Sequence, residues 1–374
     1  MLRPVQGESN KRRTLIALLI LTALLAGCST RNPGKSVAMS AGVCFIGLTN
    51  LGEFERSEGS EATAVLTSPE VVTPFPWKEL VVSWNVELPA GAGLKVEARA
   101  HSSRWSSGFY TMGLWAGEAS QHKRESVTGQ RDEYADVKTD TLVLERQASR
   151  AQVRLTLQPG KDGQIPKVKF LGLSFVGAQE EIRRGTTAVA AHGHLLDVPE
   201  KSQLAYEDGR EWCSPTCVSM VLAYWANKLG REELKHDVPA IAAAVYDRNW
   251  PGTGNWAFNT AFAGSIPGMR AFVARLADVA QLEAWVAAGV PPVASVAPDV
   301  LNGHGIQGSG GHLVVCIGFT AEGDVMVNDP WVEPGSGAKV RRTIPRARFD
   351  AAWSRSRRTV YLIFPEEHIV VSVP

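Results

Sequence analysis

The stretch WCSPTCVSMVLAYW, residues 212–225, decides the fold of the C-terminal half of this chain. Cys213 precedes Ser214, a good helix-capping residue, and Pro215, which is well tolerated at the start of a helix. Apolar side chains then recur at helical spacing before Gly230, which supplies a left-handed stop; they are Val218, Val221, Leu222, Trp225 and Leu229. The pattern predicts a helix that begins within two residues of the Cys213 thiol.

A cysteine at the N-terminus of a helix is suited to act as a nucleophile. Backbone N–H groups without partners and the positive end of the helix dipole stabilise the thiolate, which is the reactive form, and lower the thiol pKa below its free value of about 8.5. A lone cysteine is more often a small buried apolar residue. Cys213 therefore needs a base nearby before it can be interpreted as catalytic.

A histidine and a carboxylate flank a predicted β-hairpin further along the chain. Strands are expected over 313–319 and 324–328, with His312 before the first and Asp329 after the second. Positions about equally far from a hairpin turn lie side by side, so Asp329 can reach the His312 ring and fix its tautomer. Asn328 is the alternative, but neighbours on a strand face opposite ways, and we favour Asp329.

Five segments, in this order, resemble the motifs of the bacteriocin-processing cysteine peptidases and of their secreted relatives that lack a transporter. The segments are Gln203, WCSPT at 212–216, MVLAYW at 220–225, GHLVV at 311–315 and NDP at 328–330. The resemblance covers residues 198–364 and implies a papain-like fold. It also implies that Cys213 is the nucleophile, His312 the general base, Asp329 its orienter and Gln203 the side-chain donor of the oxyanion hole. No Gly-x-x-x-x-Gly-Lys-Ser/Thr motif occurs, so leader-peptide export is excluded.

One residue departs from the family pattern. Ser214 stands where the family has glycine, and we expect its side chain to narrow the cleft or to alter the approach of a substrate backbone. The candidate cleft residues are Trp212 and Ser214 beside the thiol, and Asn255 and Trp256 in a predicted turn. For Trp256 a packing role is an equally good interpretation.

The first 28 residues carry a secretion signal. Basic residues precede an apolar run over residues 15–25, which is too short to span a bilayer. The run ends at LAGC, residues 25–28, which resembles the lipobox of bacterial lipoproteins. The resemblance implies cleavage before Cys28, lipidation of its thiol and anchoring in the cell envelope: at the outer membrane where the organism has one, otherwise at the outer face of the plasma membrane.

The order of the sequence patterns predicts four segments. A signal peptide (1–27) and a linker rich in Gly, Ser and polar residues (28–64) are followed by an all-β sandwich domain (65–181), in which apolar and polar residues alternate between Pro and Gly turns. Helical and strand patterns mix in the last segment (182–374), which predicts an α+β papain-like cysteine peptidase domain. Because all the catalytic candidates lie there, we expect it to fold without the sandwich.

Besides Cys28, the chain has Cys44, Cys213, Cys217 and Cys316, in a compartment that permits disulfides. Their wide spacing is not typical of a disulfide framework and leaves their pairing open. A zinc site would be the rival interpretation, but His312 and Cys316 would lie about 13 Å apart at ~3.3 Å per strand residue, too far to share one ion. We therefore predict no metal and no cofactor.

Charge and aromatic residues bear on the partners. The net charge is +1 with both signs scattered and no basic stripe, so nucleic acid is not an expected partner. The expected partners are a peptide or protein substrate and the membrane that holds the lipid anchor. Three tryptophans of the sandwich, Trp84, Trp105 and Trp115, suggest contact with cell-wall or surface glycan, although aromatic residues on strands are more often core.

Together these features predict a membrane-anchored bacterial cysteine peptidase that hydrolyses peptide (amide) bonds through a thioester intermediate. One alternative is that an amine resolves the same thioester, which would make the protein an amidase or a transpeptidase. The other alternative is a catalytically silent surface lipoprotein that binds glycan or peptide.

Overall fold

The computed structural model describes residues 35–40, 42–59, 63–117, 120–178, 191–305, 308 and 310–368. The signal peptide, Cys28 and the predicted boundary near residue 182 lie outside the described residues. Within the described ranges, no helix is both long enough and apolar enough to cross a bilayer.

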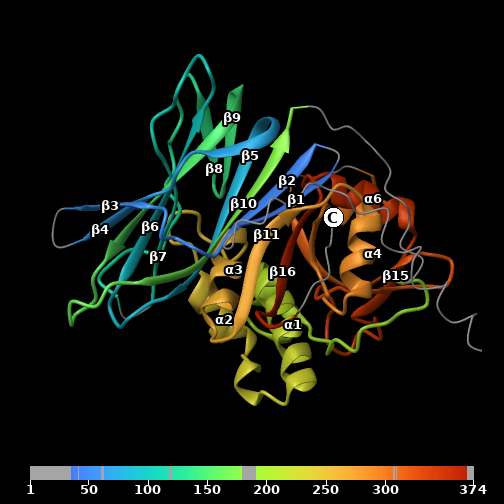
Figure 1. Ribbon diagram of the computed structural model, residues 1–374. Helices are drawn as coiled ribbons and strands as arrows, with labels where there is room; N and C mark the ends of the chain where they lie inside the picture. Colours follow the sequence, from blue (N-terminus) through green and yellow to red (C-terminus); the bar gives the residue numbers. More distant parts are fainter. Residues whose placement is uncertain are drawn as a thin grey trace, which may run out of the picture. The chain divides into compact units, whose positions relative to one another are not determined.

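In the part of the chain that the structure describes, the N-terminal half forms a β-sheet of ten strands (Figure 1). The strands are β1 (Lys35–Ser40), β2 (Val43–Leu48), β3 (Glu55–Glu58), β4 (Ala64–Thr67), β5 (Val71–Glu87), β6 (Gly93–His101), β7 (Tyr110–Ala116), β8 (Ala135–Lys138), β9 (Thr141–Gln158) and β10 (Lys167–Gly177). All pairings between them are antiparallel. The alternating patterns in the sequence therefore do form strands, as predicted.

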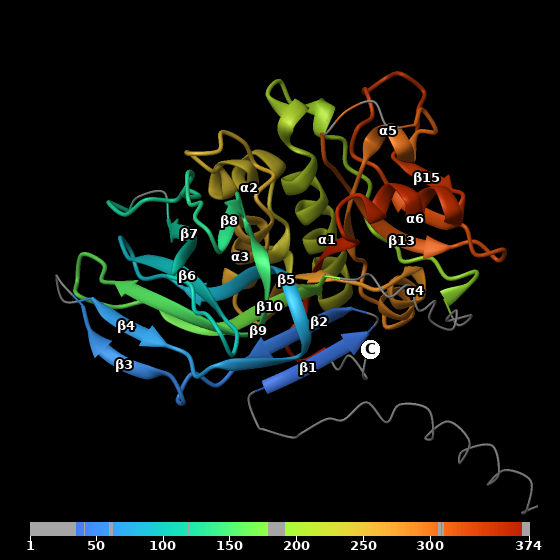
Figure 2. The same cartoon turned by 90° about the horizontal axis from the view of Figure 1, so that it is seen from above.

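These strands are joined into one curled sheet (Figure 2). The reason is the length of β9, which has 18 residues. Its first half pairs with β5 and β8 and its second half with β4 and β6, so the sheet branches along this strand. Trp84 and Trp115 are buried in its core, while Trp105 stacks on Tyr134 with 5.4 Å between ring centroids. The core positions of Trp84 and Trp115 leave neither ring available to stack on a glycan.

The predicted linker over residues 28–64 is wrong from Lys35 onward. β1 and β2 form a hairpin, and β2 pairs along its whole length with β10. Every second residue of β2, namely Cys44, Ile46 and Leu48, is buried. A strand of six residues that buries one face needs only three alternating apolar residues. Three are too few for the alternation to stand out in a sequence whose neighbouring residues are polar.

Among the residues that the structure describes, the C-terminal half has a second antiparallel sheet of six strands in the order β11-β16-β12-β13-β14-β15. Its strands are β11 (Met269–Arg275), β12 (Val293–Val296), β13 (His312–Phe319), β14 (Val325–Asn328), β15 (Arg341–Ile344) and β16 (Thr359–Pro365). Its helices are η2 (Gln203–Ala205), η3 (Gly209–Glu211), α1 (Cys213–Leu229), η4 (Glu232–Leu234), α2 (Val238–Val245), α3 (Trp256–Ser265), α4 (Val279–Ala287), α5 (Pro298–Leu301) and α6 (Arg346–Ser354). This mixture confirms the predicted α+β class.

The two decisive sequence patterns fold as predicted. Helix α1 begins at Cys213 itself and ends at Gly230, whose φ of 65° is left-handed. The helix packs against β13 and β16, and 13 of its 17 residues are buried. Strands β13 and β14 form the predicted hairpin beside it. The thiol and the histidine therefore belong to two elements that pack on each other.

The two halves meet where the first sheet covers the edge strand β11 of the second. The Asn85 side chain donates to the carbonyl of Ala271 (2.6 Å) and accepts from its N–H (3.1 Å). The next two outward N–H groups of β11, at Val273 and Arg275, donate to the hydroxyls of Ser83 (3.3 Å) and Ser174 (3.1 Å). Side chains of β5 and β10 thus bond an edge whose backbone groups would otherwise be buried without partners.

Close packing surrounds these bonds. A Cβ at Gly264 of α3 would lie 2.0 Å from Nδ2 of Asn85, so only glycine lets the helix approach this side chain. Phe258 of α3 packs against Trp115 with 5.3 Å between ring centroids. The isolated segment 182–374 would expose this apolar surface and the edge of β11, so the interface argues against the expectation that it folds alone.

This interface gives a first prediction. We expect Asn85→Ala to lower the free energy of unfolding by about 2–5 kcal/mol, because it leaves two buried backbone groups unpaired at about 1–3 kcal/mol each. Urea denaturation measures the change. Asn50→Ala, which removes an exposed side chain that bonds the N–H of Gly52, is the control and should change stability far less. Equal effects of the two substitutions would contradict the importance of the β11 edge.

Candidate active site

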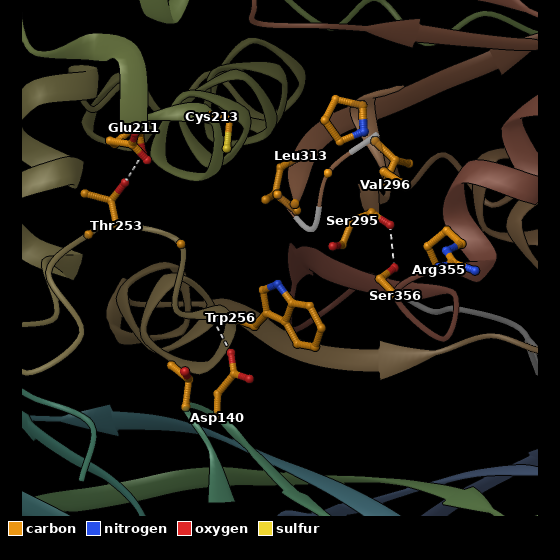
Figure 3. A pocket seen from close by; sticks show the side chains of 18 of the residues that line it. Asp140, Glu211, Cys213, Thr253, Trp256, Ser295, Val296, Leu313, Arg355 and Ser356 are labelled. Atoms are coloured by element: carbon orange, nitrogen blue, oxygen red, sulfur yellow. Dashed lines mark hydrogen bonds between the residues drawn. The ribbon is translucent and has the colours of Figure 1, made fainter. Parts of the chain in front are cut away.

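Cys213 lies at the first residue of α1, and its side chain is half-buried beside a cavity (Figure 3). The first N–H groups of a helix have no acceptor within it. Here Pro215 has no N–H, and the N–H of Thr216 donates to the carbonyl of Trp212 (3.0 Å). The N–H groups of Cys213 and Ser214 are therefore the ones that remain beside the thiol.

His312 opens β13 and meets Asp329 just beyond β14. The imidazole Nε2 and the carboxylate Oδ1 are 2.8 Å apart, and both side chains are buried. A bulge between Cys316 and Gly318 places Asn328 opposite Val315, one residue closer to His312 than an unbroken register would. The bulge requires glycine, because a Cβ at Gly318 would lie 2.2 Å from the carbonyl oxygen of His194.

Asp329 is held from several sides. Its Oδ1 also accepts from the N–H of Trp331 (3.0 Å), and its Oδ2 accepts from Nη1 of Arg342 (2.5 Å). Asn328 points elsewhere, with its side-chain amide donating to the carbonyl of Val198 (3.1 Å). The structure thus places Asp329, and not Asn328, against the histidine.

The electrostatics of this pair favour a protonated ring. Burial lowers the pKa of His312, but hydrogen bonds with Asp329 and Cys213 and the charges of both outweigh it and raise the pKa to about 10. Burial raises the pKa of Asp329, yet the His312 ring, the N–H of Trp331 and Arg342 together bring it below its usual value. Because Nε2 bonds Asp329, Nδ1 is the ring nitrogen left for the thiol.

The side chain of Gln203 is bonded to the loop that leads to Cys213. Its side chain is fully buried, and Nε2 donates to the carbonyls of Gly209 (2.9 Å) and Arg210 (2.9 Å). Both amide hydrogens are therefore used in holding the loop that leads to Cys213. Its Oε1, which cannot donate, has no partner among the described residues. The structure gives Gln203 a positioning contact and no free donor for an oxyanion.

Of the four candidate cleft residues, one lines the cavity, namely Trp256. Ser214 is buried and its hydroxyl lies 3.0 Å from that of Tyr361, so it does not narrow the cleft. Asn255 is buried as the cap of α3, where it accepts from the N–H of Phe258 (3.2 Å). Trp212 packs on Tyr206 with 5.8 Å between ring centroids.

The cavity beside Cys213 has a volume of about 640 Å³. Sequence reasoning missed most of its wall: Asp140 comes from the β8–β9 turn, and Ser295 and Arg355 come from the second half (Figure 3). Trp250 comes from the loop after α2. Gly310 and Gly311, directly before His312, also line it, and a Cβ at either would meet open space. The sequence signals for this wall were the Cys213 and GHLVV motifs and the turn around Trp256.

The other described cysteines differ from Cys213. All four are free thiols, and Cys44, Cys217 and Cys316 are buried. Burial raises the pKa of Cys44 and Cys316 to about 12 and that of Cys217 well above its usual value. No cluster of three or more His, Cys, Asp or Glu side chains able to hold a metal occurs in the described part of the chain.

Two protein families match the chain. Residues 46–175 match the family described as Peptidase C39 N-terminal domain, and residues 195–361 match the Peptidase_C39 like family. These matches support the family resemblance of the motifs and, at a coarse level, a cysteine peptidase. The first match begins inside the predicted linker, in agreement with the position of β2.

Solved structures show weaker likenesses. A C39-like peptidase from Bacillus anthracis is 19% identical over 46% of this chain and 96% of its own, with a TM-score of 0.35. A glycosylation-associated protein complex from Streptococcus agalactiae is 14% identical over 39% of this chain and 40% of its own, with a TM-score of 0.19. None of the curated proteins matches the chain.

The raised pKa of His312 predicts a pH dependence of stability. Folding favours the charged His312 ring. The ring therefore contributes most to the stability of the fold below its unfolded pKa of about 6.5, and this contribution is lost as the pH rises through about 10. In Asp329→Asn, burial still disfavours the protonated His312 ring, and no carboxylate offsets this effect. The decline of the free energy of unfolding over this pH window should therefore be smaller. Urea denaturation at a series of pH values measures it.

Glu233→Gln is the control for that series, because it removes an exposed carboxylate that pairs with Arg231. It should keep the decline of the wild type. A decline of undiminished size in Asp329→Asn would show that this carboxylate does not hold the proton on the ring.

The contacts of Gln203 predict a loss of stability. We expect Gln203→Glu to lower the free energy of unfolding by more than about 2 kcal/mol, because a carboxylate oxygen would face two carbonyl oxygens in a buried site. Gln203→Ala should cost about 1–3 kcal/mol for each carbonyl left unpaired. Gln164→Ala, at an exposed position, is the control. A fall of ~10²–10³ in turnover at unchanged stability would instead restore the oxyanion role.

Proposed function

We propose that the protein is a cysteine peptidase with a papain-like catalytic domain, in which Cys213, His312 and Asp329 form the triad. The observation that supports it best is the bond of 2.8 Å between the buried His312 ring and Asp329, next to a half-buried thiol at a helix start. The catalytic domain would begin near residue 182, and the N-terminal sheet would precede it.

The reaction would run through a thioester. The Cys213 sulfur bonds to the carbonyl carbon of the substrate, the C–N bond breaks, and protonated His312 gives its proton to the leaving amine. His312 then takes a proton from water, whose oxygen attacks the thioester; the acid leaves, and the Cys213 thiolate and protonated His312 are restored. Asp329 keeps the ring oriented and stabilises its charge in both halves of the reaction.

Negative charge on the carbonyl oxygen needs preset donors. The N–H groups of Cys213 and Ser214 suit this role, because neither has an acceptor inside the helix. The helix dipole adds to their effect. This assignment replaces the one that the family resemblance implies for Gln203, whose amide hydrogens are engaged.

The substrate would be a peptide or a protein, met at the cell envelope. The lipobox-like LAGC at residues 25–28 supports lipidation at Cys28, and Lys35 of β1 follows only a few residues later. So short a connection would keep the N-terminal sheet near the membrane that holds the anchor.

Labelling of the thiols tests the proposal. We expect iodoacetamide near neutral pH to alkylate Cys213 at least ~100-fold faster than Cys44, Cys217 or Cys316, because burial keeps those three protonated. Mass spectrometry of the digested protein measures the four rates. Cys213→Ser should abolish cleavage of a pool of unstructured synthetic peptides, and Cys44→Ala should not.

Two results would contradict the triad. One is labelling of Cys213 at the rate of the buried thiols. The other is cleavage that persists in Cys213→Ser. His312→Ala combined with Cys213→Ala should be no less active than Cys213→Ala alone, because members of one catalytic unit are strongly non-additive.

A further inference from the structure

The cavity beside Cys213 is built from both halves of the chain. Its lining includes Lys138, Thr139, Asp140 and Thr141, which form the tip of the β8–β9 hairpin of the N-terminal sheet. In Figure 3, Asp140 lies across the cavity from Cys213, next to Trp256. A substrate bound at the thiol would therefore meet side chains that precede it by more than 70 residues in the sequence.

The hairpin tip has a strained backbone. Lys138 pairs with Thr141, which leaves Thr139 and Asp140 as a two-residue turn. Thr139 has a φ of 56°, which is uncommon for a β-branched residue and is usually taken by glycine in such turns. The other non-glycine residues with positive φ in the described ranges, Arg357 and Arg358, follow directly on Arg355 and Ser356, which also line the cavity. Strain of this kind gathers at functional sites.

Asp140 joins this tip to the second half. Its Oδ2 accepts from the backbone N–H of Trp256 (2.8 Å), the first residue of α3, and its Oδ1 accepts from the hydroxyl of Thr141 (3.1 Å). A carboxylate is favoured at the N-terminus of a helix. Burial raises the pKa of Asp140 to about 6, although these hydrogen bonds lower it. The contact fixes the start of α3 and thereby the Trp256 ring in the cavity wall.

A second contact from the N-terminal half, at Ser126 in the loop between β7 and β8, holds the Trp250 loop. Asp247 is buried, and its Oδ1 accepts from the N–H groups of Ser126 (2.9 Å) and Trp250 (3.2 Å). Asn249 returns a bond to the carbonyl of Ser126 (2.9 Å). Trp250, which is 44% exposed, lines the cavity from this loop. Both tryptophans of the wall thus depend on the N-terminal sheet.

We propose that the N-terminal sheet sets the substrate specificity of the peptidase, with the Lys138–Thr141 tip limiting the size of the substrate side chain and Asp140 acting as the positioning residue for Trp256. The inference rests on the proposed function. The chemical step belongs to Cys213, His312 and Asp329, and the tip leaves their hydrogen bonds untouched. The tip therefore affects which side chains enter the cavity and leaves the reactivity of the thiol unchanged.

The test uses the full chain and electrophiles that label Cys213. A pair of peptidyl acyloxymethyl ketones, identical except for alanine or tryptophan next to the reactive group, measures side-chain preference as a ratio of labelling rates. Iodoacetamide, which is too small to contact the wall, measures the thiol itself. We expect Thr139→Gly to shift the ratio toward the tryptophan reagent by about 10-fold, because it removes a wall side chain. It should keep or raise the melting temperature, because glycine accepts the positive φ.

Asp140→Ala should also shift the ratio, and Asp140→Asn should restore most of it, because the amide oxygen can still accept from Trp256. The matched control is Asp132→Ala, which removes a carboxylate that caps Tyr134 and Ala135 at the start of β8, outside the cavity lining. It should lower stability and leave the ratio unchanged. Iodoacetamide rates should stay within about twofold in all four variants.

An unchanged ratio of labelling rates in both Thr139→Gly and Asp140→Ala would overturn the inference. The proposed function would still stand if iodoacetamide labelled Cys213 rapidly in the same variants. A shift of equal size in Asp132→Ala would also overturn it, since general loosening would then explain the effect. Slow labelling of wild-type Cys213 by iodoacetamide would overturn the proposed function, and the inference with it.

Discussion

The edge of strand β11 is the constraint on which the rest of this structure depends. A buried strand edge must have its backbone groups bonded, and here side chains of another sheet bond them in place of a further strand. Asn85, Ser83 and Ser174 reach the backbone of residues 271, 273 and 275. Because these contacts are polar, directional and buried, they fix the two halves in one register. The halves therefore cannot slide past each other without breaking several hydrogen bonds at once.

That fixed register is what allows a cavity to be shared between the halves. Asp140 bonds Trp256, and Ser126 bonds Asp247, only if the first sheet lies at a constant distance from α3 and from the loop after α2. The ion pair between the buried Arg275 of β11 and the half-buried Glu79 of β5 (2.6 Å) crosses the same interface. One set of contacts thus serves both the stability of the fold and the shape of the site.

The sequence predicted the parts of the site that depend on short segments. Helix α1 follows from spacing within 17 residues, and the approach of Asp329 to His312 follows from one hairpin. The walls depend on contacts between distant segments, such as Asn85 with Ala271, 186 residues apart, and no local pattern reports these. Gln203 shows the limit of a motif. The residue type at its position matches the family, but the direction of its amide is set by the carbonyls of Gly209 and Arg210.

In the proposed function, the site separates two tasks that place different demands on the chain. Proton transfer needs atoms within hydrogen-bond reach, and a buried hairpin next to a helix start supplies this with few residues. Selection among substrates needs a surface that surrounds the scissile bond, and the sheet that carries His312 offers only one side of it. The strained turn at Thr139 is consistent with this division, because a β-branched residue at positive φ persists only where its surroundings hold it. The hairpin tip that carries Thr139 lines the cavity together with residues of the second half, and in this way the fold connects a local reaction centre to a wall built from both halves of the chain.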